Sequence, residues 1–82
     1  MYRIETKNYM STKRNLATAR CQARLFMHAH KDNPAANDIC AAIYEVNETT
    51  WEKTLVNRFF VHDGELYLTD AQGRTINKTS WQ

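Results

Sequence analysis

Apolar and polar side chains alternate at the start of the chain and then recur at helical spacing. Residues 2–8 have the period of two that is typical of a β-strand with one covered face. The segment after them contains neither Gly nor Pro. It predicts one helix over residues 12–31, with Ser11 as its N-cap and the Asp-Asn-Pro breaker at 32–34 as its end. The apolar stripe that we expect to face the core comprises Leu16, Ala19, Ala23, Phe26 and Met27.

Residues 34–60 fit two different periods. The segment AANDICAAIYEV fits a helix, but it also fits a strand in which alternate residues share a face. Likewise, the TTWE segment at 49–52 resembles a capping box that opens a helix. We favour strands over 39–46 and 53–62 because β-branched and aromatic residues are concentrated there, and because NETT is a suitable turn between them.

The C-terminal third predicts a β-hairpin. Asp-Gly at 63–64 lies between two alternating runs, which is a strong signal for a two-residue turn. The resulting register places Phe60 opposite Tyr67 and Phe59 opposite Leu68. The face expected to meet the helix comprises Leu55, Phe59, Val61, Leu66 and Leu68. The opposite face comprises Arg58, Phe60, His62, Glu65 and Tyr67.

A second turn at 70–73 is followed by a last short strand over 74–77, and residues 77–82 are expected to form a flexible tail. The whole chain of 82 residues is therefore predicted to be a single α+β domain. In it, one long amphipathic helix packs on one face of a mainly antiparallel sheet of four to five strands, in the order β-α-β-β-β-β. Such a two-layer arrangement leaves the second face of the sheet open to a partner.

The charges are distributed unevenly along the chain. Residues 1–32 contain seven basic and two acidic side chains, whereas residues 33–82 contain four basic and seven acidic ones. This uneven charge distribution influences which partners the protein attracts and how fast they associate, but it does not determine the fold. No apolar run is long enough to span a bilayer or to act as a secretory signal, so we expect no membrane association and a cytoplasmic location. Cys21 and Cys40 are expected to be reduced.

The sequence shows no constellation of residues typical of catalysis or metal binding. It contains two glycines, so it has no glycine-rich phosphate loop, and it lacks CxxC, HxxxH and HExxH. Asp63 and Glu65 flank a turn glycine, where an aspartate is explained by backbone geometry. We therefore predict that the protein is not an enzyme and that it uses neither a cofactor nor a metal.

Two groups of residues are candidates for binding. The first is a basic helix face of Lys13, Arg14, Arg20 and Arg24, whose spacing suits a phosphate backbone or a protein partner, although solvated helix faces often have such residues. The second is the sheet face with Arg58, Phe60 and Tyr67, residue types that are enriched at protein interfaces and that also stack on bases. That patch would be unavailable if Trp51, Trp81 or a loop folded over it.

These features favour a small non-enzymatic protein that docks on another protein as an inhibitor, adaptor or regulator, a type often found in mobile elements. The alternative is a nucleic-acid-binding domain that uses the basic helix face. A third hypothesis is a homodimer formed through the sheet or through Cys21, Leu25 and Ala29.

Overall fold

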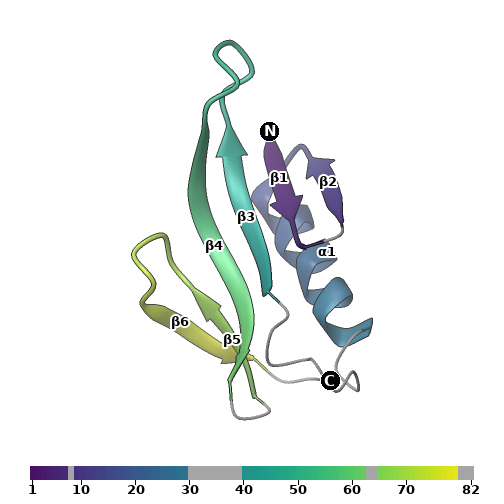
Figure 1. Ribbon diagram of the computed structural model, residues 1–82, viewed down its shortest axis with the longest axis vertical. Coiled ribbons are helices and arrows are strands. Elements are labelled where there is room, and N and C mark those ends of the chain that lie inside the picture. The colour runs from purple at the N-terminus through teal and green to yellow at the C-terminus, as the bar shows by residue number, and fades with distance from the viewer. Residues whose placement is uncertain (8, 30–39, 63–64, 80–82) are drawn as a thin grey trace.

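The computed structural model describes residues 1–7, 9–29, 40–62 and 65–79 (Figure 1). These residues form one helix and six strands, so the predicted α+β class is confirmed. The order is β-β-α-β-β-β-β, with one strand more at the N-terminus than the sequence predicted. The elements are β1 (Tyr2–Glu5), β2 (Met10–Lys13), α1 (Leu16–Ala29), β3 (Cys40–Val46), β4 (Lys53–His62), β5 (Glu65–Thr69) and β6 (Thr75–Thr79).

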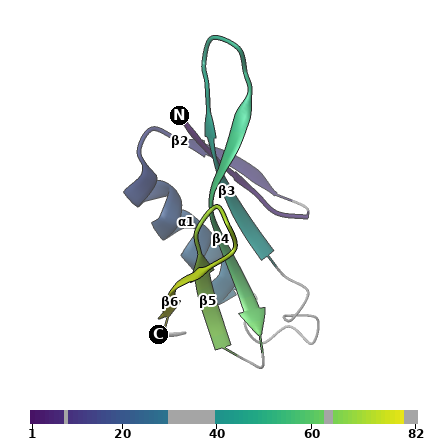
Figure 2. The ribbon, with the colours of Figure 1, turned by 90° about the vertical axis from the view of Figure 1, so that its left-hand side faces the viewer.

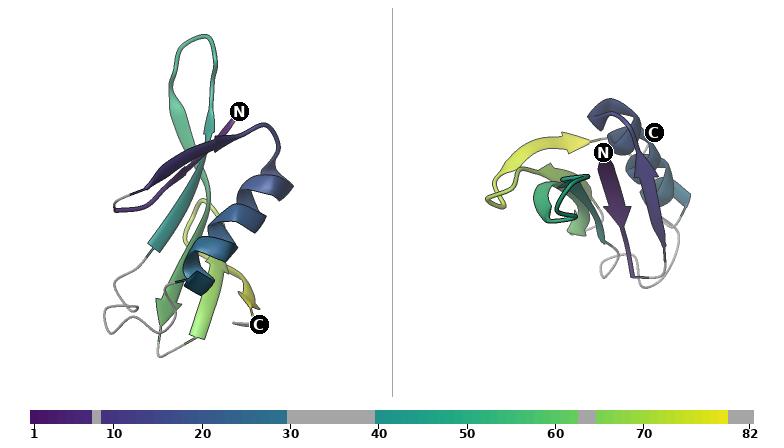
Figure 3. Two further views of the ribbon diagram at one scale, coloured as in Figure 1. Left: turned by 90° about the vertical axis from the view of Figure 1, so that its right-hand side faces the viewer. Right: turned by 90° about the horizontal axis from the view of Figure 1, so that it is seen from above.

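All six strands form one antiparallel sheet in the order β2-β1-β3-β4-β5-β6. The sheet curves around α1, which lies on one face against β1, β2, β3 and β4 (Figure 3). Within the described residues, no helix has the length and apolar content needed to cross a membrane.

The beginning of the helix differs from the prediction. The chain is extended through Lys13, and α1 begins at Leu16 with Asn15, not Ser11, as its N-cap: the Thr18 N–H donates to Asn15 Oδ1 at 2.8 Å. The cause is tertiary, because residues 10–13 obtain their backbone hydrogen bonds by pairing with β1. The predicted end of the helix at 31–34 lies outside the described residues.

The helix packs against the sheet through the predicted stripe. Ala19, Ala23 and Met27 are buried, and Leu16 and Phe26 pack against the same core cluster. The two alanines are fully buried, so they let the helix backbone approach the sheet closely. Tyr9, just before β2, stacks on Phe26 with 5.6 Å between ring centroids, which fixes the β1–β2 hairpin against the helix.

Strands β3 and β4 confirm the strand interpretation of the middle segment over the residues that the structure describes. The NETT segment closes a hairpin instead of opening a helix. Asn47 Oδ1 accepts hydrogen bonds from the backbone N–H groups of Thr49 (2.8 Å) and Thr50 (3.2 Å). Trp51 completes the loop with a φ of 63°, a left-handed conformation that costs a bulky residue roughly 1–2 kcal/mol.

The predicted register of the β4–β5 hairpin is confirmed in all five pairs, although the turn at 63–64 lies outside the described residues. Phe59 is 2% exposed and faces the helix side, as predicted. The core cluster comprises Ile4, Ala19, Ala23, Met27, Ala41, Ile43, Phe59, Val61 and Leu66.

The predicted position of Leu55 in this core was wrong. The pairing of β3 with β4 shifts by one residue: Ile43 lies opposite Asn57, whereas Tyr44 lies opposite Leu55. Val56 is the extra residue of a β-bulge, and a bulge reverses which face the preceding side chains occupy. Leu55 therefore shares the face of Tyr44, and the polar Asn57 takes a core position with 1% exposure.

The turn between β5 and β6 is organised by Asp70. Its carboxylate accepts hydrogen bonds from the backbone N–H groups of Gln72 (3.0 Å) and Arg74 (2.9 Å) and from Arg74 Nε (3.2 Å). Gly73 has a φ of 85°, which a side chain would strain. Strand β6 extends to Thr79, two residues beyond the predicted end, and residues 80–82 of the predicted tail lie outside the described part.

These contacts predict a pH dependence of stability. The Arg74 backbone hydrogen bond, followed by that of Gln72 and the Arg74 charge, lowers the pKa of Asp70. A lowered folded-state pKa stabilises the protein above the unfolded value of about 3.9, and this stabilisation is lost as the pH falls below it. Asp70→Asn should therefore lower the urea midpoint at pH 7, and the difference from wild type should shrink between pH 5 and pH 2.5. Parallel curves over that range would contradict the role of this carboxylate.

Candidate functional site

The two faces of the sheet differ in what covers them. Helix α1 lies on one face, and no described element lies on the other (Figures 2 and 3). We call this second face the open sheet face. By register, its central side chains are Arg3, Tyr44, Leu55, Arg58, Phe60 and Tyr67.

The three residues predicted for the sheet-face patch are brought together. Phe60 and Tyr67 are cross-strand partners, and their rings stack with 5.5 Å between centroids and an angle of 21°. Both side chains are half-buried, whereas Arg58, two residues earlier on the same strand face, is exposed. The result is a rigid aromatic pair with a guanidinium group beside it.

Trp51 does not cover this patch. It is 63% exposed and lies in the loop between β3 and β4, at the far end of β4 from Phe60. Trp81, the other tryptophan considered as a cover, lies outside the described residues. No described helix or strand packs over the aromatic pair.

A second cluster on the open sheet face was not found from the sequence. Lys53 Nζ lies 4.4 Å from the centre of the Tyr44 ring and 2.9 Å and 3.1 Å from the two carboxylate oxygens of Glu5. Arg3 adds a longer ion pair to the same carboxylate, at 3.9 Å. The cluster depends on the pairing of β1 with β3 and on the bulge in β4, neither of which has a local sequence signal.

Cys40 lies beside the aromatic pair as the cross-strand partner of Phe60. Burial raises the pKa of its thiol because a thiolate loses hydration there, and the nearby charge of Arg58 opposes this only in part. Cys40 is thus a protonated packing residue at neutral pH. Both cysteines are free, and Cys21 is exposed on α1.

The basic residues predicted to share one helix face do not do so. Arg20 and Arg24 are on α1, but Lys13 belongs to β2 and Arg14 to the turn that follows it. Moreover, Arg20 Nε donates a hydrogen bond to Asn57 Oδ1 at 3.0 Å, and Asn57 Nδ2 donates to the Thr69 carbonyl at 3.0 Å. Arg20 therefore connects the helix to the core face of the sheet. The predicted ridge was wrong for Lys13 and Arg14 because β2 replaces the first turns of the helix.

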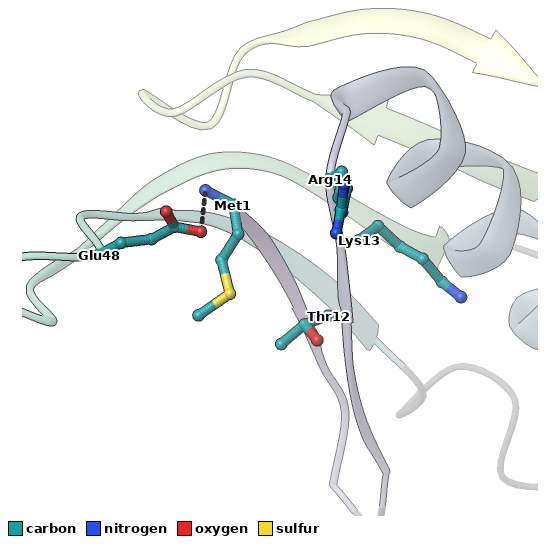
Figure 4. Close-up of a pocket in the computed structure, with 5 residues that line it drawn as sticks. All are labelled: Met1, Thr12, Lys13, Arg14 and Glu48. Atoms are coloured by element: carbon teal, nitrogen blue, oxygen red, sulfur yellow. Dashed lines mark ion pairs between the residues drawn. The ribbon is translucent and has the colours of Figure 1, made fainter.

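Lys13 and Arg14 instead line a shallow pocket with Met1, Thr12 and Glu48 (Figure 4). Its volume is about 280 Å³, just below the ~300–1,000 Å³ typical of small-molecule sites. The α-amino group of Met1 lies 3.9 Å from the Glu48 carboxylate, and Lys13 points away from that pair (Figure 4). Met1 supplies the largest apolar side chain of its lining, and the other four residues are polar or charged.

Within the described residues, no three His, Cys, Asp or Glu side chains are grouped as metal ligands would be. The structure thus defines a two-layer α+β domain whose most distinctive surface is the aromatic and cationic centre of the open sheet face. Comparison of the chain with protein-family models, with curated proteins and with solved structures gave no match.

Proposed function

We propose that this chain is a non-enzymatic binding protein that docks on another protein through the open sheet face, as an inhibitor, adaptor or regulator does. The stacked Phe60–Tyr67 pair beside the exposed Arg58 is the observation that supports this proposal. Aromatic residues and Arg are enriched in protein interfaces, and Tyr and Arg are enriched among the residues that contribute most to binding. Because the rings already stack on one another, little side-chain entropy remains to be lost on binding.

The size of the sheet limits what this face provides alone. Six strands at about 4.8 Å spacing are roughly 24 Å wide, and five residues of strand are roughly 17 Å long. The flat area is thus near 400 Å², compared with about 800 Å² per partner in a standard interface. A tight complex would need contacts beyond the sheet face as well.

Removing the aromatic pair should abolish binding. Phe60→Ala combined with Tyr67→Ala, and separately Arg58→Glu, should reduce capture of the partner from a lysate of the source organism by at least about 10-fold. Capture would be measured by quantitative mass spectrometry, with folding of each variant checked by circular dichroism. Leu25→Ala is the matched control, because Leu25 is 59% exposed on the helix and should tolerate the change. Equal capture by wild type and both sheet variants would contradict the proposal.

The same proteins also test the other hypotheses. Binding of a labelled oligonucleotide that weakens steeply with salt, and that is lost in a Lys13→Glu, Arg14→Glu variant, would replace protein binding by nucleic-acid binding. Lys13 and Arg14 are the suitable sites because Arg20 is engaged with the buried Asn57. A dimer mass in light scattering that disappears in the Phe60→Ala, Tyr67→Ala variant would identify a second copy as the partner.

A further inference from the structure

Four large apolar side chains are exposed in the described part of the chain: Met10, Leu25, Trp51 and Ile76. Trp51 differs from the others in its position. It lies in the β3–β4 loop, which projects beyond the rest of the molecule (Figures 1 and 2). It is 63% exposed, and it is not among the residues that form or flank the core cluster.

Hydrogen bonds within the loop hold the backbone of Trp51 in place. The Trp51 N–H donates to the Asn47 carbonyl at 2.7 Å, and the Asn47 N–H donates to the Glu52 carbonyl at 2.9 Å. The Asn47 side chain holds the two threonines between them. An exposed aromatic residue on an ordered loop is preorganised for contact, because the loop has little conformational freedom left to lose.

Trp51 is not the residue that this backbone favours. At a φ of 63°, glycine or asparagine would be accommodated with less strain. The backbone conformation of the loop therefore does not favour an indole here, and an observed outlier of this kind is a reason to look for a function. Tryptophan, the bulkiest amino acid, thus occupies a position at which a smaller residue would relieve the strain in the loop backbone.

The charges around Trp51 indicate the kind of partner. Glu48 and Glu52 are exposed on either side of it, and Glu52 forms no ion pair within the described residues. Glu48 lies 3.9 Å from the Met1 amino group and lines a pocket with Lys13 and Arg14, whereas Lys53, which follows Glu52, is bonded to Glu5. Two carboxylates beside the indole oppose contact with phosphate groups or an anionic membrane, and they favour a surface with basic side chains.

We propose that the β3–β4 loop is a second contact element, in which Trp51 inserts into an apolar cleft of the partner protein whose rim bears Lys or Arg. This inference rests on the proposed function only in that the partner is a protein. Phe60 lies on β4 and Trp51 lies in the loop before it, nine residues earlier, a span of at most roughly 30 Å, so the two elements contact separate parts of the partner and extend the small sheet interface.

The first experiment is site-specific photo-crosslinking. The full chain would have p-benzoylphenylalanine at position 51 or, as the matched control, at position 25, where Leu25 is 59% exposed on α1, on the other side of the sheet from the open face. An adduct specific to position 51, mapped to a partner peptide that lines an apolar cleft bordered by basic residues, is the expected result. Absence of a position-specific adduct, or an adduct on an acidic or flat surface, would overturn the inference.

The second experiment measures affinity for the captured protein after its purification. Trp51→Gly should weaken binding at least about 30-fold, while its Tm stays equal to that of wild type or rises by up to about 5 °C because the strained φ is relieved. Glu48→Lys with Glu52→Lys should weaken binding about 10-fold at low salt and less at high salt. Unchanged affinity of Trp51→Gly would refute the insertion of Trp51.

These results are separable from the proposed function. If the Phe60→Ala, Tyr67→Ala variant loses the partner and Trp51→Gly keeps it, the sheet face binds and the loop does not. If Trp51→Gly loses the partner and the sheet variant keeps it, the loop binds and the proposal for the open sheet face fails.

Discussion

Replacing Phe59 by alanine is expected to unfold much of the protein at 37 °C, whereas the same change at Phe60 should leave it folded. Phe59 is 2% exposed in the core cluster, so its truncation should cost about 3–5 kcal/mol through lost transfer energy and the cavity left behind. A domain of this size has a total stability near the lower end of the 5–15 kcal/mol range. Phe60 is only half-buried, and its loss should cost about 1 kcal/mol.

The measurement is urea unfolding of both variants, followed by circular dichroism. The two changes are chemically identical and adjacent in sequence, so each serves as the control for the other. Equal loss of stability in the two variants would show that a further element covers the open sheet face. The proposal for that face would then need revision, because a covered aromatic pair could not contact a partner.

The second large effect is expected at Asn57. Replacing it by alanine should lower the free energy of unfolding by about 2–4 kcal/mol, because it removes the hydrogen bond to Arg20 Nε and leaves the Thr69 carbonyl without this donor next to a buried cavity. Asn57→Leu should be destabilising as well, since volume alone does not restore the two hydrogen bonds. Both changes would be measured by chemical denaturation.

A double-mutant cycle with Arg20→Ala isolates the link between helix and sheet. Arg20 is half-buried, so its guanidinium regains water when Asn57 is removed, and Arg20→Ala alone should cost about 1 kcal/mol. The double variant should be less destabilised than the sum of the single changes, by about 0.5–1.5 kcal/mol. Strict additivity would mean that Arg20 and Asn57 are not coupled. Asn57 would then stabilise the protein through its hydrogen bond to the Thr69 carbonyl alone.

The expected losses of stability distinguish residues that stabilise the fold from residues of the open sheet face that are available to a partner. Arg20 was a candidate for binding, but its hydrogen bond to a buried side chain makes it a structural residue. Arg58 has the same charge, is exposed, and lies beside the aromatic pair. The charge reversal that best tests binding is therefore at Arg58.

The sequence by itself determined the elements whose signals are local. The Asp-Gly turn and the alternation around it specify the register of the β4–β5 hairpin, and with it the opposite faces of Phe59 and Phe60. The stripe from Leu16 to Met27 likewise specifies the buried side of α1, because helical spacing alone decides which side chains share a face.

Only the tertiary structure decided the features that depend on distant partners. The sequence predicted residues 12 and 13 as the start of the helix, but pairing with β1 makes residues 10–13 a strand. The bulge that turns Leu55 outward and Asn57 inward follows from the pairing of β4 with β3. Propensity is a weak local preference of tenths of a kcal/mol per residue, so a ladder of backbone hydrogen bonds to another segment overrides it.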